Sequence, residues 1–171
     1  KPHCITIDNE GIGHFYGHEE HSREIAYAVM KRLRYDNRTV ESVTTLIKNH
    51  GTVFVLSRRA AKRMLNKLGE EKVKLLTEIR IADVSAQSPA KLDERIKKVI
   101  TFRQIIDEIL EQNQCFSLKD LAINGKDLMA IGMKEGKDIG EVLVRLMEMV
   151  MDEDIDNQRE ELLSRAKEMK P

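Results

Sequence analysis

The sequence has 171 residues, of which 41% are hydrophobic and 4% aromatic, so it is long enough to bury the core of one helical domain or two small ones. Its 29 basic and 29 acidic residues cancel, which excludes the strong overall positive field of a generally cationic nucleic-acid binder. Cys4 and Cys115 lack paired spacing, and charged residues interrupt every apolar stretch before the roughly 20 residues of a membrane span. We therefore expect a soluble, cytoplasmic protein that contacts no membrane, and the abundance of Leu, Ile, Met, Lys, Glu and Arg favours an all-α fold.

The first half of the chain predicts a short extended start followed by helices. Residues 1–17 alternate weakly and turn near Asn9, which predicts an extended loop or a small hairpin. Apolar residues at helical spacing predict helices over about 18–34 and 36–50, the second capped by Asp36. Ser57 predicts the start of a third helix that ends at Gly69, and a fourth helix follows with Val73, Leu76, Ile79 and Ala82 on one face.

The second half begins with a long helix and continues with short ones. Pro89 at the first helical turn costs no hydrogen bond, so it predicts the start of a helix that joins two subregions. Capping signals predict short helices after it, including Ser117 with Asp120 and Asn157 with Glu160. The predicted organisation is a helical bundle over 1–88, a connecting helix over 89–114 and a smaller helical unit over 115–171.

Basic residues gather on the third predicted helix, although the chain as a whole is neutral. Helical spacing places them on neighbouring lines of one face, which makes them candidates for contacts with RNA phosphates; they are Arg58, Arg59, Lys62, Arg63 and Lys67. Such a stripe can equally be a solvated helix face. A second RNA-binding candidate is the glycine-containing turn with Lys134 and Lys137, where helix amides suit phosphate, although the turn can also be a plain helix connection.

Four of the five histidines lie within the first 21 residues: His3, His14, His18 and His21. Imidazole binds divalent transition metals well, so this clustering permits a metal site. The alternative is that these histidines are exposed or satisfied within the core, because no spacing fixes a cysteine or carboxylate ligand beside them.

Two stretches resemble one family. Residues 14–20 read His-Phe-Tyr-Gly-His-Glu-Glu and precede a basic helix, and residues 116–128 read Phe-Ser-Leu-Lys-Asp-Leu-Ala-Ile-Asn-Gly-Lys-Asp-Leu, with a Gly-Met-Lys-Glu-Gly-Lys-Asp-Ile-Gly segment at 132–140. Together they resemble the C-terminal part of bacterial CCA-adding tRNA nucleotidyltransferases and their poly(A) polymerase relatives. The resemblance implies an HD-domain-like helical bundle followed by a tail that holds tRNA.

The same resemblance implies a division of labour in a longer parent protein. The parent would add CCA, or poly(A), to RNA 3′ ends from nucleoside triphosphates and magnesium in a catalytic head, while this chain would correspond to body and tail. We accordingly expect no catalytic residue and no cofactor in this chain, and tRNA as its partner. The opening Lys1-Pro2 resembles the remnant of a Gly-Lys-Pro that follows the His-Asp pair of HD domains, so we expect that pair to precede the chain.

HD-type phosphohydrolases bind one or two metals through histidines and a late aspartate. By resemblance His18 and His50 match the further histidines and Asp83 matches the aspartate, which implies an incomplete divalent-metal site. A metal-dependent HD phosphohydrolase domain is therefore the alternative function. A third alternative is a passive helical module that forms a homodimer.

Overall fold

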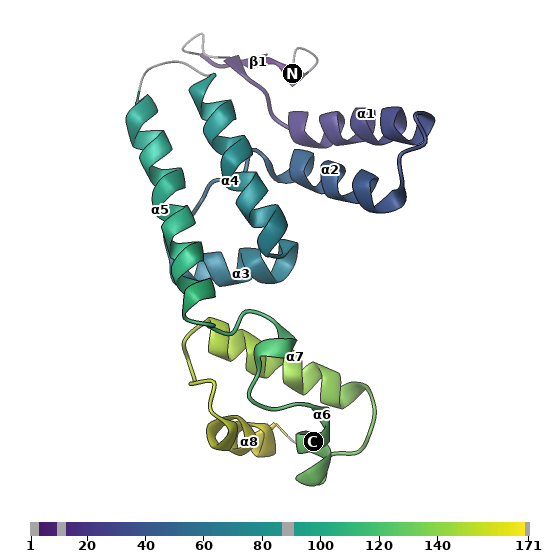
Figure 1. Ribbon diagram of the computed structural model, residues 1–171, viewed down its shortest axis with the longest axis vertical. Helices are drawn as coiled ribbons and strands as arrows, with labels where there is room; N and C mark the ends of the chain where they lie inside the picture. The colour runs from purple at the N-terminus through teal and green to yellow at the C-terminus, as the bar shows by residue number, and fades with distance from the viewer. Residues whose placement is uncertain (1–3, 10–12, 87–90, 170–171) are drawn as a thin grey trace. The chain divides into compact units, whose positions relative to one another are not determined.

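The computed structural model describes residues 4–9, 13–86 and 91–169. These residues form eight α-helices and one short hairpin, so the all-α prediction is confirmed (Figure 1). The hairpin pairs β1 (Thr6–Ile7) with β2 (Gly13–His14) in antiparallel register. Within the described ranges, no helix combines the length and the apolar character that a membrane span requires. The start predicted at Pro89 lies outside the described residues.

The chain divides into two compact units. The first contains residues 1–54 and 70–100, and the second contains residues 55–69 and 101–171. The helix α5 (Leu92–Glu111) belongs to both, because the division falls after Ile100. This grouping differs from the predicted ranges in placing the third helix with the C-terminal residues.

The first unit contains a pair of neighbouring helices. Helices α1 (His18–Arg32) and α2 (Asn37–Asn49) run antiparallel and side by side (Figure 1). The Asp36 side chain caps α2 by accepting a hydrogen bond from the Thr39 amide at 2.9 Å, as predicted. Helix α4 (Glu70–Ser85) supplies much of the interior. The buried apolar residues of this unit are Val40, Phe54, Val73, Leu76, Val84 and Val99.

The second unit is built on α3 (Arg58–Leu68) and α7 (Lys137–Met151). Ser57 caps α3 as predicted, and Gly69 ends it with φ +79°, a left-handed conformation that favours glycine. The short 3₁₀ turn η2 (Leu118–Asp120) and helices α6 (Gly125–Ala130) and α8 (Arg159–Glu168) complete the unit. One cluster of buried residues in this unit includes Leu128, Leu146 and Leu162, and Ala61, Leu65, Phe102, Ile106 and Ile109 are buried as well.

Two local predictions in this unit are wrong. Asn157 does not form a capping box with Glu160, because Gln158 is the N-cap of α8 and the Asn157 side chain bonds to a different segment. The glycine-containing turn predicted to hold both Lys134 and Lys137 is shorter than expected, because α7 already begins at Lys137. The predicted box of Ser117 and Asp120 is confirmed.

Candidate functional sites

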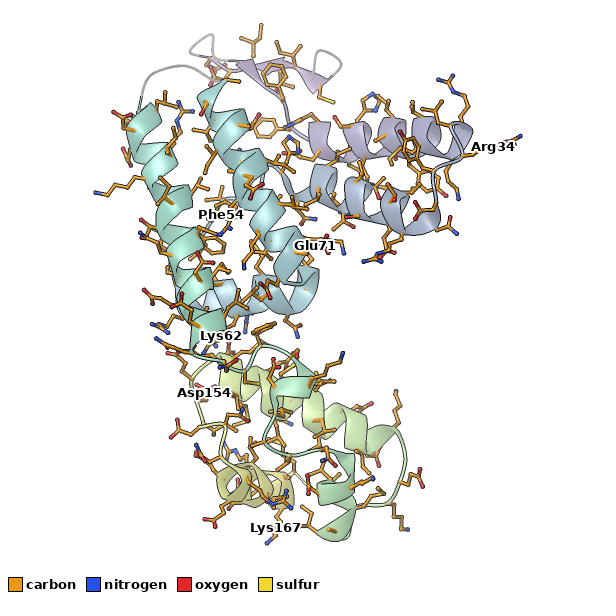
Figure 2. The ribbon with its side chains drawn as sticks, viewed as in Figure 1. Arg34, Phe54, Lys62, Glu71, Asp154 and Lys167 are labelled. Atoms are coloured by element: carbon orange, nitrogen blue, oxygen red, sulfur yellow. The ribbon has the colours of Figure 1, made fainter. Side chains whose placement is uncertain are left out.

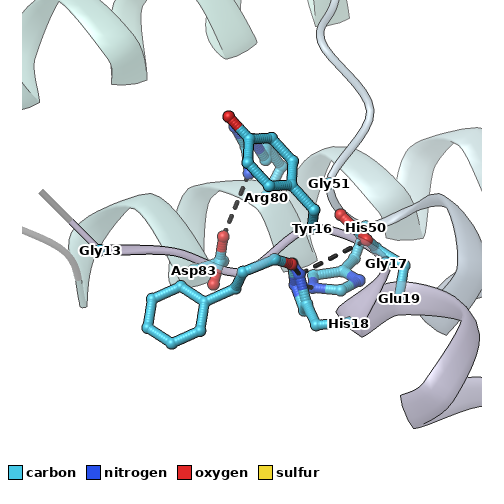
Figure 3. Close-up of a pocket in the computed structure, with 10 residues that line it drawn as sticks. Gly13, Tyr16, Gly17, His18, Glu19, His50, Gly51, Arg80 and Asp83 are labelled. Atoms are coloured by element: carbon cyan, nitrogen blue, oxygen red, sulfur yellow. Dashed lines mark hydrogen bonds and ion pairs between the residues drawn. The ribbon is translucent and has the colours of Figure 1, made fainter. Parts of the chain in front are cut away.

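A pocket in the first unit brings together the three residues predicted as metal ligands. It has a volume of about 460 Å³, and His18, His50 and Asp83 all line it (Figure 3). His18 is the first residue of α1, His50 is the C-cap of α2, and Asp83 lies in the last turns of α4. Residues that are 65 positions apart in sequence therefore face one cavity.

The hydrogen bonds of the two histidines fix their tautomers. The Nδ1 atom of His18 lies 2.6 Å from the Phe15 carbonyl oxygen, and that of His50 lies 2.6 Å from the Ile47 carbonyl oxygen. A carbonyl oxygen only accepts, so each Nδ1 carries a hydrogen and donates it. In the neutral rings, both Nε2 atoms consequently carry lone pairs.

These two Nε2 atoms face one another at 3.1 Å (Figure 3). Two lone pairs at that distance repel, and a proton or a cation between them removes the repulsion. Nitrogen ligands at about 2.0–2.1 Å from a common zinc ion lie about 3.0–3.4 Å apart, so the separation suits two ligands of one metal. The histidine pair therefore fits either a shared proton or a bound cation.

Asp83 lines the same pocket, but its carboxylate is engaged by Arg80. Its Oδ2 accepts a hydrogen bond from Nη1 of Arg80 at 3.1 Å, and both side chains are largely buried (Figure 3). Across the part of the chain that the structure describes, no three histidine, cysteine or acidic side chains gather closely enough to hold one metal ion. His3 and the side chain of His14 lie outside the described residues.

The second unit holds the basic helix α3, whose predicted phosphate-binding residues make ion pairs within the unit. Arg58 donates to Glu108 at 2.7 Å. Arg59 and Arg63 both bind the carboxylate of Asp152, which follows α7. Lys67 is exposed.

Lys62 does not lie on the exposed line of the helix. Lys62 is only 5% exposed, and its ammonium nitrogen lies 3.3 Å from Glu153. Figure 2 labels Lys62 and also Asp154, which lies in the same loop as Glu153. Lys62 lies one helical turn after Arg58, but it also directly follows Ala61, which is buried. The face available to a ligand therefore excludes Lys62.

The guanidinium groups of Arg59 and Arg63 remain accessible despite their shared partner. Their side chains are 55% and 58% exposed, whereas that of Asp152 is 12% exposed. The hydrogen bond from Arg59, and then that from Arg63, hold the pKa of the Asp152 carboxyl below its ordinary value. The two arginines share the single carboxylate of Asp152, and the charge of Asp154 also acts on Arg59.

The second predicted RNA contact, at Lys134 and Lys137, is an exposed turn. Gly136 is the N-cap of α7 and Lys137 is its first residue. Lys137 lies 3.3 Å from Glu141 one turn later, and Asp138 adds a negative charge to the first turn. Glu141 and Asp138 offset the two lysines, so this turn offers an anion less positive charge than α3 does.

Sequence reasoning missed the role of Asp152 and Glu153. The acidic segment 148–161 stands out in the sequence as the opposite of the basic segment 58–74. That complementarity is a signal for pairing, but it does not say which residues meet across about 90 positions.

Comparisons with known proteins now bear on these sites. No solved structure matches the chain. The chain is similar to the CCA-adding enzyme of Enterococcus faecalis (strain ATCC 700802 / V583), with 28% identity over 143 residues. The match covers 82% of this chain and 31% of that enzyme, so the chain spans about a third of the length of the curated relative. A family model described as "tRNA nucleotidyltransferase domain 2 putative" matches residues 13–166, and the chain therefore belongs to this tRNA nucleotidyltransferase family.

Proposed function

We propose that the chain holds tRNA for a nucleotidyltransferase that adds CCA, or poly(A), to RNA 3′ ends, the chemistry being performed by a separate catalytic head with magnesium. The observation that carries this proposal is the pair Arg59 and Arg63 on α3. Both side chains are more than half exposed, and their guanidinium groups bind the same carboxylate. A guanidinium group can donate two parallel hydrogen bonds to two phosphate oxygens. A protein can bind tRNA through its backbone and shape without contacting base edges.

Family membership supports this role, and the distribution of charge explains how a neutral chain can perform it. The 29 basic and 29 acidic residues give no overall attraction for RNA. A local pair of arginines does not need an overall attraction between chain and RNA, because each contact with a phosphate releases counterions where it forms. Arg58 and Lys67 extend the same helix, and Lys134 and Lys137 are the weaker candidates.

The test is the binding of a tRNA transcript that lacks its 3′ CCA, measured by fluorescence anisotropy between about 50 and 200 mM salt. We expect the double substitution Arg59→Gln with Arg63→Gln to weaken binding about tenfold and to reduce the salt slope by about 1 to 2. Arg32→Gln with Arg38→Gln is the matched control, because both residues are exposed and the same two charges are lost. Equal losses in the two variants would contradict a site on α3.

A second function, a metal-dependent phosphohydrolase of the HD type, is favoured by the facing Nε2 atoms of His18 and His50. These two nitrogens fit a divalent metal, with Asp83 in the same pocket as a further candidate ligand. When bound, such a metal would activate water for attack on a phosphate ester. The backbone carbonyl groups of Phe15 and Ile47 hold both imidazole rings with Nε2 free to bind the metal.

Calorimetric titration with nickel or manganese tests this second proposal without relying on activity. We expect His18→Ala or His50→Ala to abolish binding and Asp83→Ala to weaken it. His21→Ala is the control, because His21 lies on the same helix but does not line the pocket. Binding that survives the loss of His18 would reject the site.

A further inference from the structure

The loop after α7 makes repeated contacts with the basic helix α3. Asp152 binds both Arg59 and Arg63, and the next residue, Glu153, pairs with Lys62 at 3.3 Å. Two consecutive carboxylates therefore meet three of the four basic residues between positions 58 and 63. Both segments belong to the second unit.

The Asp152 carboxylate uses the donors that a phosphate would use. Nε and Nη2 of Arg59 point to its two oxygens, which is the two-pronged geometry of arginine with a carboxylate or a phosphate. Nη2 of Arg63 lies 3.0 and 2.8 Å from the same two oxygens. An RNA phosphate approaching these donors meets a carboxylate already in place.

We propose that Asp152 is an intramolecular competitor of RNA phosphates at the arginine pair, and that tRNA displaces it when it binds. This inference rests on the proposed function, since it concerns the same two arginines. Competition by the Asp152 carboxylate makes the arginine pair selective for polyanions. A single small anion gains little by replacing a carboxylate, whereas a folded RNA brings further phosphates to neighbouring basic residues such as Arg58 and Lys67.

The contact is built so that it can open. Asp152 is the C-cap of α7, where the negative end of the helix dipole disfavours another negative charge. The arginines offset that cost, but more than half of each arginine side chain faces water, which competes for the same hydrogen bonds.

Helix α3 keeps its place by other contacts when this one opens. Its Ala61 and Leu65 are buried, and Lys62 remains paired with Glu153. Asn66 donates a hydrogen bond from Nδ2 to the Phe116 carbonyl oxygen at 2.8 Å. Loss of the Asp152 carboxylate should therefore free the arginines without unfolding the unit.

The experiment measures binding of the same truncated tRNA to Asp152→Asn, which keeps the size of the side chain and removes its charge. We expect affinity about three- to tenfold higher than that of the unsubstituted chain near 50 mM salt, with a salt slope steeper by about 1. Asp154→Asn is the matched control, because it removes one negative charge from the same loop. Asp154 influences Arg59 through its charge, without a hydrogen bond of the kind that Asp152 makes. Asp152→Ser is a second variant from which we expect a gain in the same direction, and far-ultraviolet circular dichroism checks whether each variant remains helical.

The outcomes separate this inference from the proposed function. If tRNA binds the chain but Asp152→Asn leaves affinity unchanged or lower, the competitor role is wrong while tRNA binding stands. An equal gain in Asp154→Asn, or a gain that persists when Arg59→Gln and Arg63→Gln are added, also overturns it. If the chain does not bind tRNA even at the lowest salt, the proposed function itself fails.

Discussion

Asn157 joins two segments of the second unit through a single amide. Its Nδ2 donates to the Asp120 carbonyl oxygen at 2.7 Å, and its Oδ1 accepts from the Ala122 amide at 2.9 Å. The loop before α8 is thereby tied to the chain beside η2. The Asp120 carbonyl group lies at the end of η2 and the Ala122 amide lies just beyond it, so Asn157 satisfies two backbone groups where the turn ends.

Removing this amide should destabilise the chain. We expect Asn157→Ala to lower the free energy of unfolding by about 1–3 kcal/mol, because it leaves a backbone donor and a backbone acceptor without their partner. Asn157→Asp keeps an acceptor for Ala122 but places a carboxylate against the Asp120 carbonyl, so we expect it also to be destabilising. Urea denaturation followed by circular dichroism measures both.

Gln158→Ala is the neighbouring control. Gln158 is exposed and its side chain makes no capping hydrogen bond to α8, so its loss should change the free energy of unfolding by less than about 0.5 kcal/mol. Should Asn157→Ala prove as mild as this control, the two hydrogen bonds do not hold the segments together in solution.

At the scale of elements, local signals in the sequence predicted helix starts well. Asp36, Ser57 and Ser117 each accept or exchange hydrogen bonds with a residue three positions away, so the relevant partner is visible within one turn. Asn157 bonds to residues 35 and 37 positions away, and its capping role was predicted wrongly because its partners are set by tertiary structure.

The same reasoning separates the predicted from the unpredicted parts of the candidate sites. The resemblance placed His18, His50 and Asp83 together, and the structure brings all three to one pocket. Helical spacing placed Arg59 and Arg63 on one face, which the structure shows, but not the burial of Lys62. The pairing with Asp152 was unpredictable from one sequence, since charge complementarity alone gives no register between distant segments.

Across the whole molecule, apolar stripes of similar pattern are buried to very different extents. Helix α7 buries six residues, among them Leu146 at 0% exposure. Helix α1 also carries apolar residues at helical spacing, yet none of its residues is buried, and Ile25 and Val29 are 52% and 38% exposed. Periodicity therefore predicted both helices, but not which of them contributes to a core.

This contrast predicts unequal effects of removing side chains of the same size. Leu146→Ala should lower the free energy of unfolding by about 2–5 kcal/mol, because it opens a cavity in the core. Ile25→Ala should cost less than about 1 kcal/mol, because its side chain is already half in water. In hydrogen exchange measured by mass spectrometry, amides of α1 should exchange faster than those of α7, because exchange follows local opening.

The comparison also tests whether the apolar stripe of α1 is covered in solution. If a second copy of the chain covered it, as in the homodimer expected for a passive helical module, Ile25→Ala would be costly and the midpoint of unfolding would rise with protein concentration. If the chain stands alone, the midpoint is independent of concentration and α1 is the first helix to exchange. Repeating the denaturation at two concentrations about a hundredfold apart distinguishes the two, since mass action shifts a dimer's stability by about 2.7 kcal/mol over that range.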